Sequence, residues 1–326
     1  MRTIASCLVL GAVLVPLAGA APAVAGAPTR VWVAGTGTDS GTCGAVSAPC
    51  ATFQQAHDNA ADGGEISVLT PGDFQPLTIN KSISITNDGS GEAGIQQPGG
   101  NAVFINAGAG AIVGLRGLVV DGATTGAFGI TLITGTALHI QNCVIRNFEG
   151  QPTSTGILFG PFAHSQMFVS DTIVYNNGQG ANSGGIFVQP AINGVANVVL
   201  ERVQLENNVF GLKVDGSSNN SANGAFVIVR DSVFSGNAGD GLVASTTTGK
   251  AGVLVFVSDS AVVGNANNGI LANGPHGTVL VSDSIVTRNA TGINAQNSGQ
   301  IISYQNNDID NNTGPDGVPT STRTQH

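Results

Sequence analysis

The feature that most constrains how this chain folds is a short string that recurs at regular intervals. Val-Ser-Asp-Thr at 169–172 returns as Val-Arg-Asp-Ser at 229–232 and as Val-Ser-Asp-Ser at 257–260 and 281–284, with looser copies at 140–143 and 200–203. The third residues of these strings serve as anchors: Asn142, Asp171, Arg202, Asp231, Asp259, Asp283 and a degenerate Asn306. Their gaps are 29, 31, 29, 28, 24 and 23 residues. This period indicates stacked units, each burying its face against its neighbours.

Each unit divides into three short strands separated by turns. In one unit the strands are expected at 167–169, 172–175 and 185–188, and a Gly-Ile or Gly-Leu pair opens the third strand of most units. Three strands and three turns in a minimum of about 23 residues describe a parallel β-helix. The sequence therefore predicts an all-β fold, a single right-handed parallel β-helix with three-strand coils and a short N-terminal capping helix.

Two columns of residues keep a constant offset from the anchors. Apolar residues lie three positions after them, at Ile145, Val174, Leu205, Phe234, Val262, Val286 and Ile309. Asparagines lie six positions after them, at Asn177, Asn208, Asn237, Asn265, Asn289 and Asn312. Because stacked strands repeat about every 4.8 Å, the first column predicts an internal apolar row. The second predicts hydrogen-bonded turns.

The chain divides into four segments. Residues 1–25 have Arg2, an apolar stretch at 4–17 and Ala-Val-Ala at 23–25, the pattern of a signal peptide for a secreted or periplasmic protein. Residues 26–65 are expected to form a cap with a strand at 31–33, a cysteine loop and a helix over 52–61, begun by a Thr52–Gln55 capping box. The β-helix is predicted over 66–312, followed by a polar tail at 313–326. No later stretch reaches the ~20 apolar residues of a membrane span.

Cysteine positions indicate one disulfide. Cys43 and Cys50 bracket a short loop, and in an oxidising compartment this spacing favours a bond between them. Cys143 occupies the position after an anchor, where other units have serine or threonine. It is expected to be a small buried residue rather than a reactive thiol.

Charge narrows the choice of partners. The net charge is −9 and no cluster of Lys and Arg is visible, which argues against nucleic acid. An acidic polysaccharide would also be repelled unless local cations intervened. The sequence does not fix the oligomeric state.

The Val-Ser-Asp-Ser, Asn and Gly-Ile units resemble the repeats of the pectate-lyase-like superfamily. The segments 64–68, 71–74 and 81–85 are similar to the entry coils of its secreted members. The resemblance implies a parallel β-helix and a role on carbohydrates, since members include polysaccharide lyases, hydrolases, epimerases and adhesins. It also implies that an active-site groove, if there is one, lies on the outer face of the Gly-Ile strand.

That outer face is predicted from strand alternation. One outward column holds Thr131, Leu158, Phe187, Lys213, Val243, Leu271 and Asn294, and the next holds Ile133, Gly160, Gln189, Asp215, Ser245, Asn273 and Gln296. These are mostly apolar and amide side chains. The Asn-Thr-Asp, Asp-Asp and Gly-His-Gly strings of the superfamily hydrolases are absent, as are the Trp-Ile-Asp-His and Arg-Xaa-Pro-Xaa-Xaa-Arg strings of pectate lyases.

The favoured hypothesis is therefore a non-catalytic, exported protein that binds a surface, an extracellular or envelope polysaccharide, or a cell-surface glycan. Its candidate binding residues are Phe187, Leu158, Gln189, Asn273 and Asn294. One alternative is a lyase-like enzyme with Lys213 as base, flanked by Asp215 and Asp240. Another is an adhesin-like structural protein.

No cofactor or metal is predicted. The aspartate column at positions 171, 231, 259 and 283 raises calcium as an alternative. Turn chemistry accounts for it more simply, because Asp accepts backbone hydrogen bonds and tolerates tight bends. The histidines at positions 57, 139, 164 and 276 do not have the spacing of metal ligands.

Overall fold

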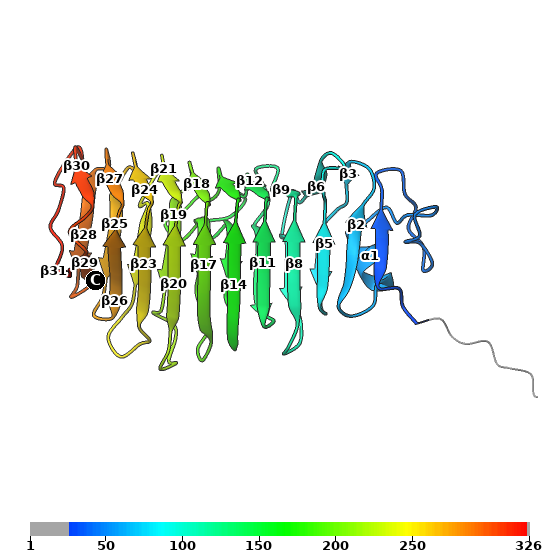
Figure 1. Ribbon diagram of the computed structural model, residues 1–326, viewed down its shortest axis with the longest axis horizontal. Coiled ribbons are helices and arrows are strands. Elements are labelled where there is room, and N and C mark those ends of the chain that lie inside the picture. Colours follow the sequence, from blue (N-terminus) through cyan, green and yellow to red (C-terminus); the bar gives the residue numbers. More distant parts are fainter. Residues whose placement is uncertain (1–25, 325–326) are drawn as a thin grey trace, which may run out of the picture.

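The computed structural model describes residues 26–324, and the predicted signal peptide lies outside them. Within this range the chain forms a rod of stacked coils, with the N-terminal coils at one end and the C-terminal coils at the other (Figure 1). Every pairing between named strands is parallel, and the strands form three sheets. The fold is thus the predicted parallel β-helix with three-strand coils.

The largest sheet has twelve strands, and Figure 1 shows many of them side by side. In spatial order they are β1 (Arg30–Val33), β2 (Gly64–Val68), β5 (Ile83–Thr86), β8 (Ile112–Arg116), β11 (Ala137–Gln141), β14 (His164–Ser170), β17 (Val195–Glu201), β20 (Ala225–Arg230), β23 (Val253–Ser258), β26 (Gly277–Ser282), β29 (Gln300–Ser303) and β31 (Ser321–Thr322). The six strands from β11 to β26 each end directly before an anchor residue.

The ten-stranded sheet follows the anchors and holds the predicted apolar row. Its strands are β3 (Gly72–Asp73), β6 (Ala93–Gln96), β9 (Leu118–Asp121), β12 (Val144–Arg146), β15 (Ile173–Tyr175), β18 (Gln204–Glu206), β21 (Val233–Ser235), β24 (Ala261–Val263), β27 (Ile285–Thr287) and β30 (Asp308–Asp310).

The nine-stranded sheet contains the Gly-Ile strands. It comprises β4 (Leu77–Ile79), β7 (Asn101–Asn106), β10 (Phe128–Thr134), β13 (Thr155–Phe159), β16 (Gly184–Val188), β19 (Phe210–Asp215), β22 (Leu242–Ser245), β25 (Asn268–Asn273) and β28 (Thr291–Gln296).

The internal apolar row is confirmed. Successive members pair directly across the ten-stranded sheet: Ile145, Val174, Leu205, Phe234, Val262, Val286 and Ile309. All but Ile309, in the last coil, are fully buried. Burying side chains of this size stabilises a fold by about 1.5–3 kcal/mol each. The row therefore holds the coils together along the length of the rod.

The anchors are left-handed turn residues. Their φ angles are +48° to +52° at Asn142, Asp171, Arg202, Asp231, Asp259 and Asp283. Asn and Asp adopt this conformation at lower cost than most residues, which accounts for the aspartate column. Arg202 is the exception, and its Nε donates a 2.6 Å hydrogen bond to Asp171 in the preceding coil. This contact lowers the pKa of Asp171.

The predicted asparagine column forms a hydrogen-bonded ladder. From Asn177 onward, the backbone N–H of each member donates to Oδ1 of the next at 2.9–3.2 Å. The side-chain amides of most members donate to the same oxygens. The ladder ends on Asp316, whose Oδ1 accepts from the backbone N–H and side-chain amide of Asn312. These bonds lower the pKa of Asp316.

The N-terminal helix α1 (Phe53–Asn59) is shorter than the predicted 52–61, because Ala60 is already extended. Half of the capping box forms: the Thr52 hydroxyl accepts from the Gln55 N–H at 3.1 Å. The reciprocal bond does not form, because Asp39 Oδ1 accepts from the Thr52 N–H while Gln55 donates to Asn59. The packed face of α1 covers the first coils.

The hydrogen-bonded sheet extends beyond the predicted limits of 66–312. Strand β1, within the predicted cap, pairs in register with β2. Strand β31, within the predicted tail, pairs with β29. The predicted strand at 31–33 is thus confirmed as β1, although its place in the sheet was not predicted. Backbone pairing needs no repeat motif in the side chains, so β31 has no signature in the sequence.

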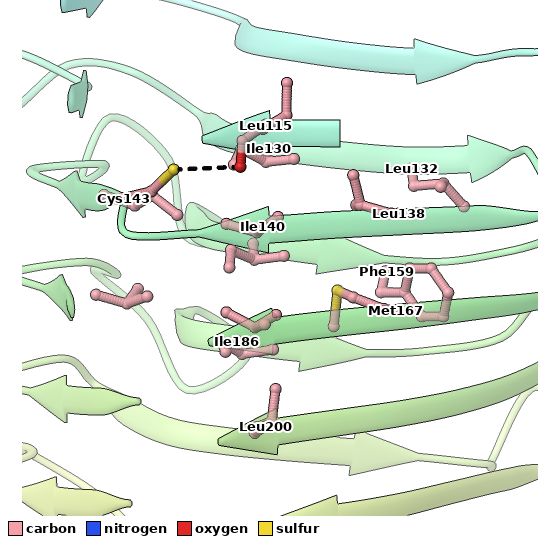
Figure 2. Close-up of a cluster of buried hydrophobic side chains, with 14 of the residues drawn as sticks. Leu115, Ile130, Leu132, Leu138, Ile140, Cys143, Phe159, Met167, Ile186 and Leu200 are labelled. Carbon is pink, nitrogen blue, oxygen red and sulfur yellow. Dashed lines mark hydrogen bonds between the residues drawn. The ribbon is translucent and has the colours of Figure 1, made fainter. Parts of the chain in front are cut away.

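Both cysteine predictions are confirmed. Cys43 and Cys50 are bonded to each other, whereas Cys143 is a buried free thiol. Its Sγ donates to the Gln141 carbonyl at 3.3 Å and the Leu115 carbonyl at 3.7 Å, within a cluster of buried apolar side chains (Figure 2). Burial raises the pKa of Cys143 to about 11.

Removing one ladder residue is expected to destabilise the whole rod. Asn237→Ala leaves the buried Asn208 N–H without its acceptor. It also removes the side-chain amide that donates to Asn265 Oδ1. We expect the free energy of unfolding to fall by about 2–3 kcal/mol, measured by urea denaturation. Asn193→Ala, at an exposed loop position, is the matched control and should change it by less than about 0.5 kcal/mol. Equal effects of the two substitutions would contradict the role of the ladder.

The Cys143 thiol is expected to be inert in the folded protein. In a chain beginning at residue 26, Ellman's reagent at pH 8 should react at least about 100-fold more slowly than with an exposed thiol, because little thiolate forms and access is blocked. One thiol per chain should react after denaturation without reductant. Rapid reaction of the native protein would contradict the buried position.

Candidate functional site

The outer face of the nine-stranded sheet has the register that strand alternation predicts. Its first outward column pairs directly from strand to strand, through Thr131, Leu158, Phe187, Lys213, Val243, Leu271 and Asn294. The residues on either side of the members from Thr131 to Leu271, such as Ile186 and Val188, are fully buried in the core, and Ala295 beside Asn294 is partly buried. The predicted face is therefore the actual outer face of this sheet.

A hollow of about 440 Å³ lies on this face, over strands β10, β13, β16 and β19. Four residues singled out from the sequence line it: Leu158, Phe187, Gln189 and Asp215. Three further residues line it: Phe128, Thr153 and Asn182. Its floor is thus aromatic and aliphatic, while amide, hydroxyl and carboxylate groups surround that floor.

Lys213 lies beside the hollow and is held by two contacts. Its Nζ donates a 2.9 Å hydrogen bond to Asn182 Oδ1 and lies 5.3 Å from the centre of the Phe187 ring. Phe187 also packs edge-on against Phe210. These contacts fix both the ammonium group and the ring, so the hollow has a preformed wall.

The two aspartates of the alternative enzymatic hypothesis are not brought together. Asp215 ends strand β19, where its Oδ1 accepts from the Ser217 N–H. Asp240 lies before β22, at the level of Phe210, and its Oδ1 accepts from the backbone N–H and side-chain amide of Asn268. Five residues of strand separate the two levels, which is about 17 Å. Lys213, Asp215 and Asp240 therefore do not form one cluster.

Asn273 and Asn294 also lie outside the hollow. They belong to β25 and β28, further along the rod. Asn294 donates to Asn268 Oδ1 at 3.0 Å, and Asn273 accepts from Asn297 at 2.8 Å. Both amides thus take part in bonds between coils. Of the five predicted binding residues, the structure gathers only Phe187, Leu158 and Gln189.

A second hollow, of about 310 Å³, lies over the ten-stranded sheet and was not predicted. Its lining includes Asp73, Glu92, Asp121 and Arg146. Burial pushes the pKa of Asp121 upward, but hydrogen bonds from the Ala123 N–H and Arg146 outweigh this and leave it lowered. The direct pairing of Asp121 with Arg146 across strands could have been found by extending the repeat register backwards.

Metal ligands are scarce in the part of the chain that the structure describes. The single group of clustered ligand atoms there is Asp39 with Cys43 and Cys50. Its sulfurs are bonded to each other, and the Asp39 carboxylate already accepts hydrogen bonds from Ala51 and Thr52. This arrangement closes the cysteine loop onto the start of α1.

Comparison of the chain with models of known protein families, with curated proteins and with solved structures finds no match. Across residues 26–324, no helix has the length and apolar character needed to cross a bilayer.

Lys213 is expected to hold the loop at 178–183 against the hollow. Lys213→Met removes the bond to Asn182, and an exposed charged contact of this kind contributes about 0–1 kcal/mol. Backbone hydrogen exchange over 178–183 should become about two- to five-fold faster, measured by mass spectrometry.

Lys250→Met is the matched control, because Lys250 makes the equivalent bond to Asn220 in another loop. It should leave exchange over 178–183 unchanged. Identical exchange in the two variants would show that Lys213 does not hold this loop.

Proposed function

We propose that this protein is an exported, non-catalytic glycan-binding protein of the pectate-lyase-like type, and that the hollow over β10, β13, β16 and β19 is its binding site. The observation that carries the proposal is the chemistry of the lining. Phe128, Leu158 and Phe187 offer an apolar floor for the C–H face of a sugar ring. Thr153, Asn182 and Gln189 offer hydrogen bonds to hydroxyl groups around it.

Carboxylate placement supports binding over cleavage. Glycoside hydrolases need two carboxyl groups about 5–9.5 Å apart across the scissile bond. Asp215 and Asp240 lie about 17 Å apart along the strand direction, and each accepts hydrogen bonds from the protein itself. Lys213 is engaged by Asn182 and Phe187 rather than free to act as a base.

The charges of the site favour a neutral glycan. Asp215 contributes a carboxylate to the hollow, and the ammonium group of Lys213 lies beside it. These two charges offset each other, while the chain as a whole carries −9. A polyuronate would therefore gain little local attraction against the net repulsion.

Export is supported by two features. The N-terminal residues have the composition of a signal peptide, and the Cys43–Cys50 disulfide suits an oxidising compartment. Both fit a secreted or periplasmic protein that meets extracellular or envelope polysaccharide.

A glycan array followed by calorimetry with the retained glycan tests the proposal. Leu158→Ala and Gln189→Ala should each weaken binding at least about tenfold, a loss of about 1.4 kcal/mol. Ile285→Ala, at an exposed position on the ten-stranded sheet, should leave the affinity unchanged. Absorbance at 235 nm should show no unsaturated product with any polysaccharide.

Two outcomes would reject the proposal. One is retention of no glycan, or an affinity that neither hollow substitution changes. The other is polysaccharide cleavage that Lys213→Ala abolishes, which would instead support the lyase-like alternative.

A further inference from the structure

A continuous apolar row runs along the outer face of the twelve-stranded sheet, away from the proposed binding site. Direct strand pairing aligns its seven members: His139, Phe168, Val199, Ile228, Phe256, Leu280 and Ile302. We call these residues the outer row. Their neighbours in each strand, such as Val227 and Val229, are fully buried in the core, so the outer row lies on the outer side of the sheet. Its last two members, Leu280 and Ile302, are only 8% and 6% exposed.

Several side chains of this face are well exposed. Phe168 in the outer row is 36% exposed, and Phe226 and Leu254 in the flanking column are 38% and 37% exposed. The His139 and Phe168 rings stack at 4.9 Å, which extends the flat apolar surface. A sheet face that meets only water normally alternates to polar residues. A row of aromatic and aliphatic side chains that stays at least partly exposed from β11 to β23 indicates a partner surface.

The size of the face suits a stable protein interface. The six strands from β11 to β26, spaced about 4.8 Å apart, make it about 29 Å long, and three outward columns make it about 20 Å wide. This gives about 580 Å² on one molecule and about 1,160 Å² for two, above the ~1,000 Å² that a specific interface needs. Figure 1 shows the strands of this sheet side by side and nearly parallel, a shape that allows two such faces to pack.

The charges beside the outer row favour a second copy of the same chain. The third outward column lies two residues after the outer row in each strand. In it Glu201 of β17 and Arg230 of β20 are direct neighbours, and their side chains form an ion pair at 2.9 Å. A two-fold axis parallel to the strands and midway between β17 and β20 places Glu201 of each copy opposite Arg230 of the other. Ser170 and Ser258, the next residues in that column, face each other without adding charge.

The same axis also matches the apolar side chains. It places Val199 opposite Ile228 and Phe168 opposite Phe256 of the second copy, because β14 and β23 lie equally far from the axis. The outer row and the Glu201–Arg230 column are therefore self-complementary, as a two-fold interface requires. In the flanking column the same axis places Phe226 and Leu254 opposite Asn197 and Gln166.

We propose that this protein forms a two-fold homodimer through the outer row, with the axis between β17 and β20. This interface is independent of the proposed glycan site, which lies on the nine-stranded sheet. The dimer leaves both glycan sites uncovered and holds two of them in one assembly.

Sedimentation velocity of the mature chain is the first test. The wild type should sediment as a dimer, and Ile228→Glu should weaken dimerisation at least about 100-fold and give a monomer. Ile285→Glu is the matched control, because Ile285 is 47% exposed on the ten-stranded sheet. It should remain a dimer. A monomeric wild type overturns the proposal, as does a dimer that Ile228→Glu leaves intact.

Cross-linking tests the axis. Phe168→Cys and Phe256→Cys proteins, mixed and mildly oxidised, should form a disulfide-linked pair that neither variant forms efficiently alone. The buried Cys143 does not compete. Equal cross-linking in the mixture and in the separate samples overturns the proposed axis. A wild type that stays monomeric and binds insoluble polysaccharide through the outer row would overturn the dimer itself.

Discussion

The coils from Asn142 to Asp283 turn at the same point, and the rest of the structure depends on that constraint. A left-handed residue at each of these anchors sends the chain from the twelve-stranded sheet into the ten-stranded sheet, and at the degenerate anchor Asn306 the preceding Gln305 takes this conformation instead. Because the turn recurs at one level, successive strands pair without a shift and equivalent side chains stack. A one-residue slip would move the whole apolar row to the outside. The turn thus determines which side chains form the core. Through the same register it also determines which side chains lie on the three outer faces.

Residues with a fixed offset from the anchors were predictable. The apolar row and the asparagine ladder follow from counting from the anchors. The outward columns of the nine-stranded sheet follow from counting from the Gly-Ile and Gly-Leu pairs, since strand alternation is strict. The outer row was missed for a physical reason. Segments such as Val-Leu-Val-Phe-Val at 253–257 are apolar at every position, so alternation cannot distinguish the inner side from the outer side.

The candidate site was predictable only in part, because loops complete it. Leu158 and Phe187 lie in regular strands and Gln189 directly follows β16, so their register placed them on one face. Thr153 and Asn182 belong to insertions that lengthen their coils beyond the 23-residue minimum, and the repeat says nothing about insertion conformation. The grouping of Asp240 with Asp215 was a wrong prediction. Asp240 belongs to the neighbouring coil, as predicted, but it lies five residues away along the strand direction.

The asparagine ladder also gives the rod a polarity. Its backbone N–H groups all point toward the C-terminal end, whereas the side-chain amides also donate to carbonyls of the preceding coil, as from Asn208 to Val174. The polarity therefore lies in the backbone bonds, whose dipoles add in one direction, as peptide dipoles do in a helix. The donor end meets the negative charge of Asp316, while the acceptor end receives the Phe148 N–H. Because each junction repeats the same bonds, whole coils can be inserted or removed between these terminators without a new kind of contact. The number of coils, and with it the length of the rod, can therefore vary by duplication of one repeat. Every added coil must have the same orientation as its neighbours.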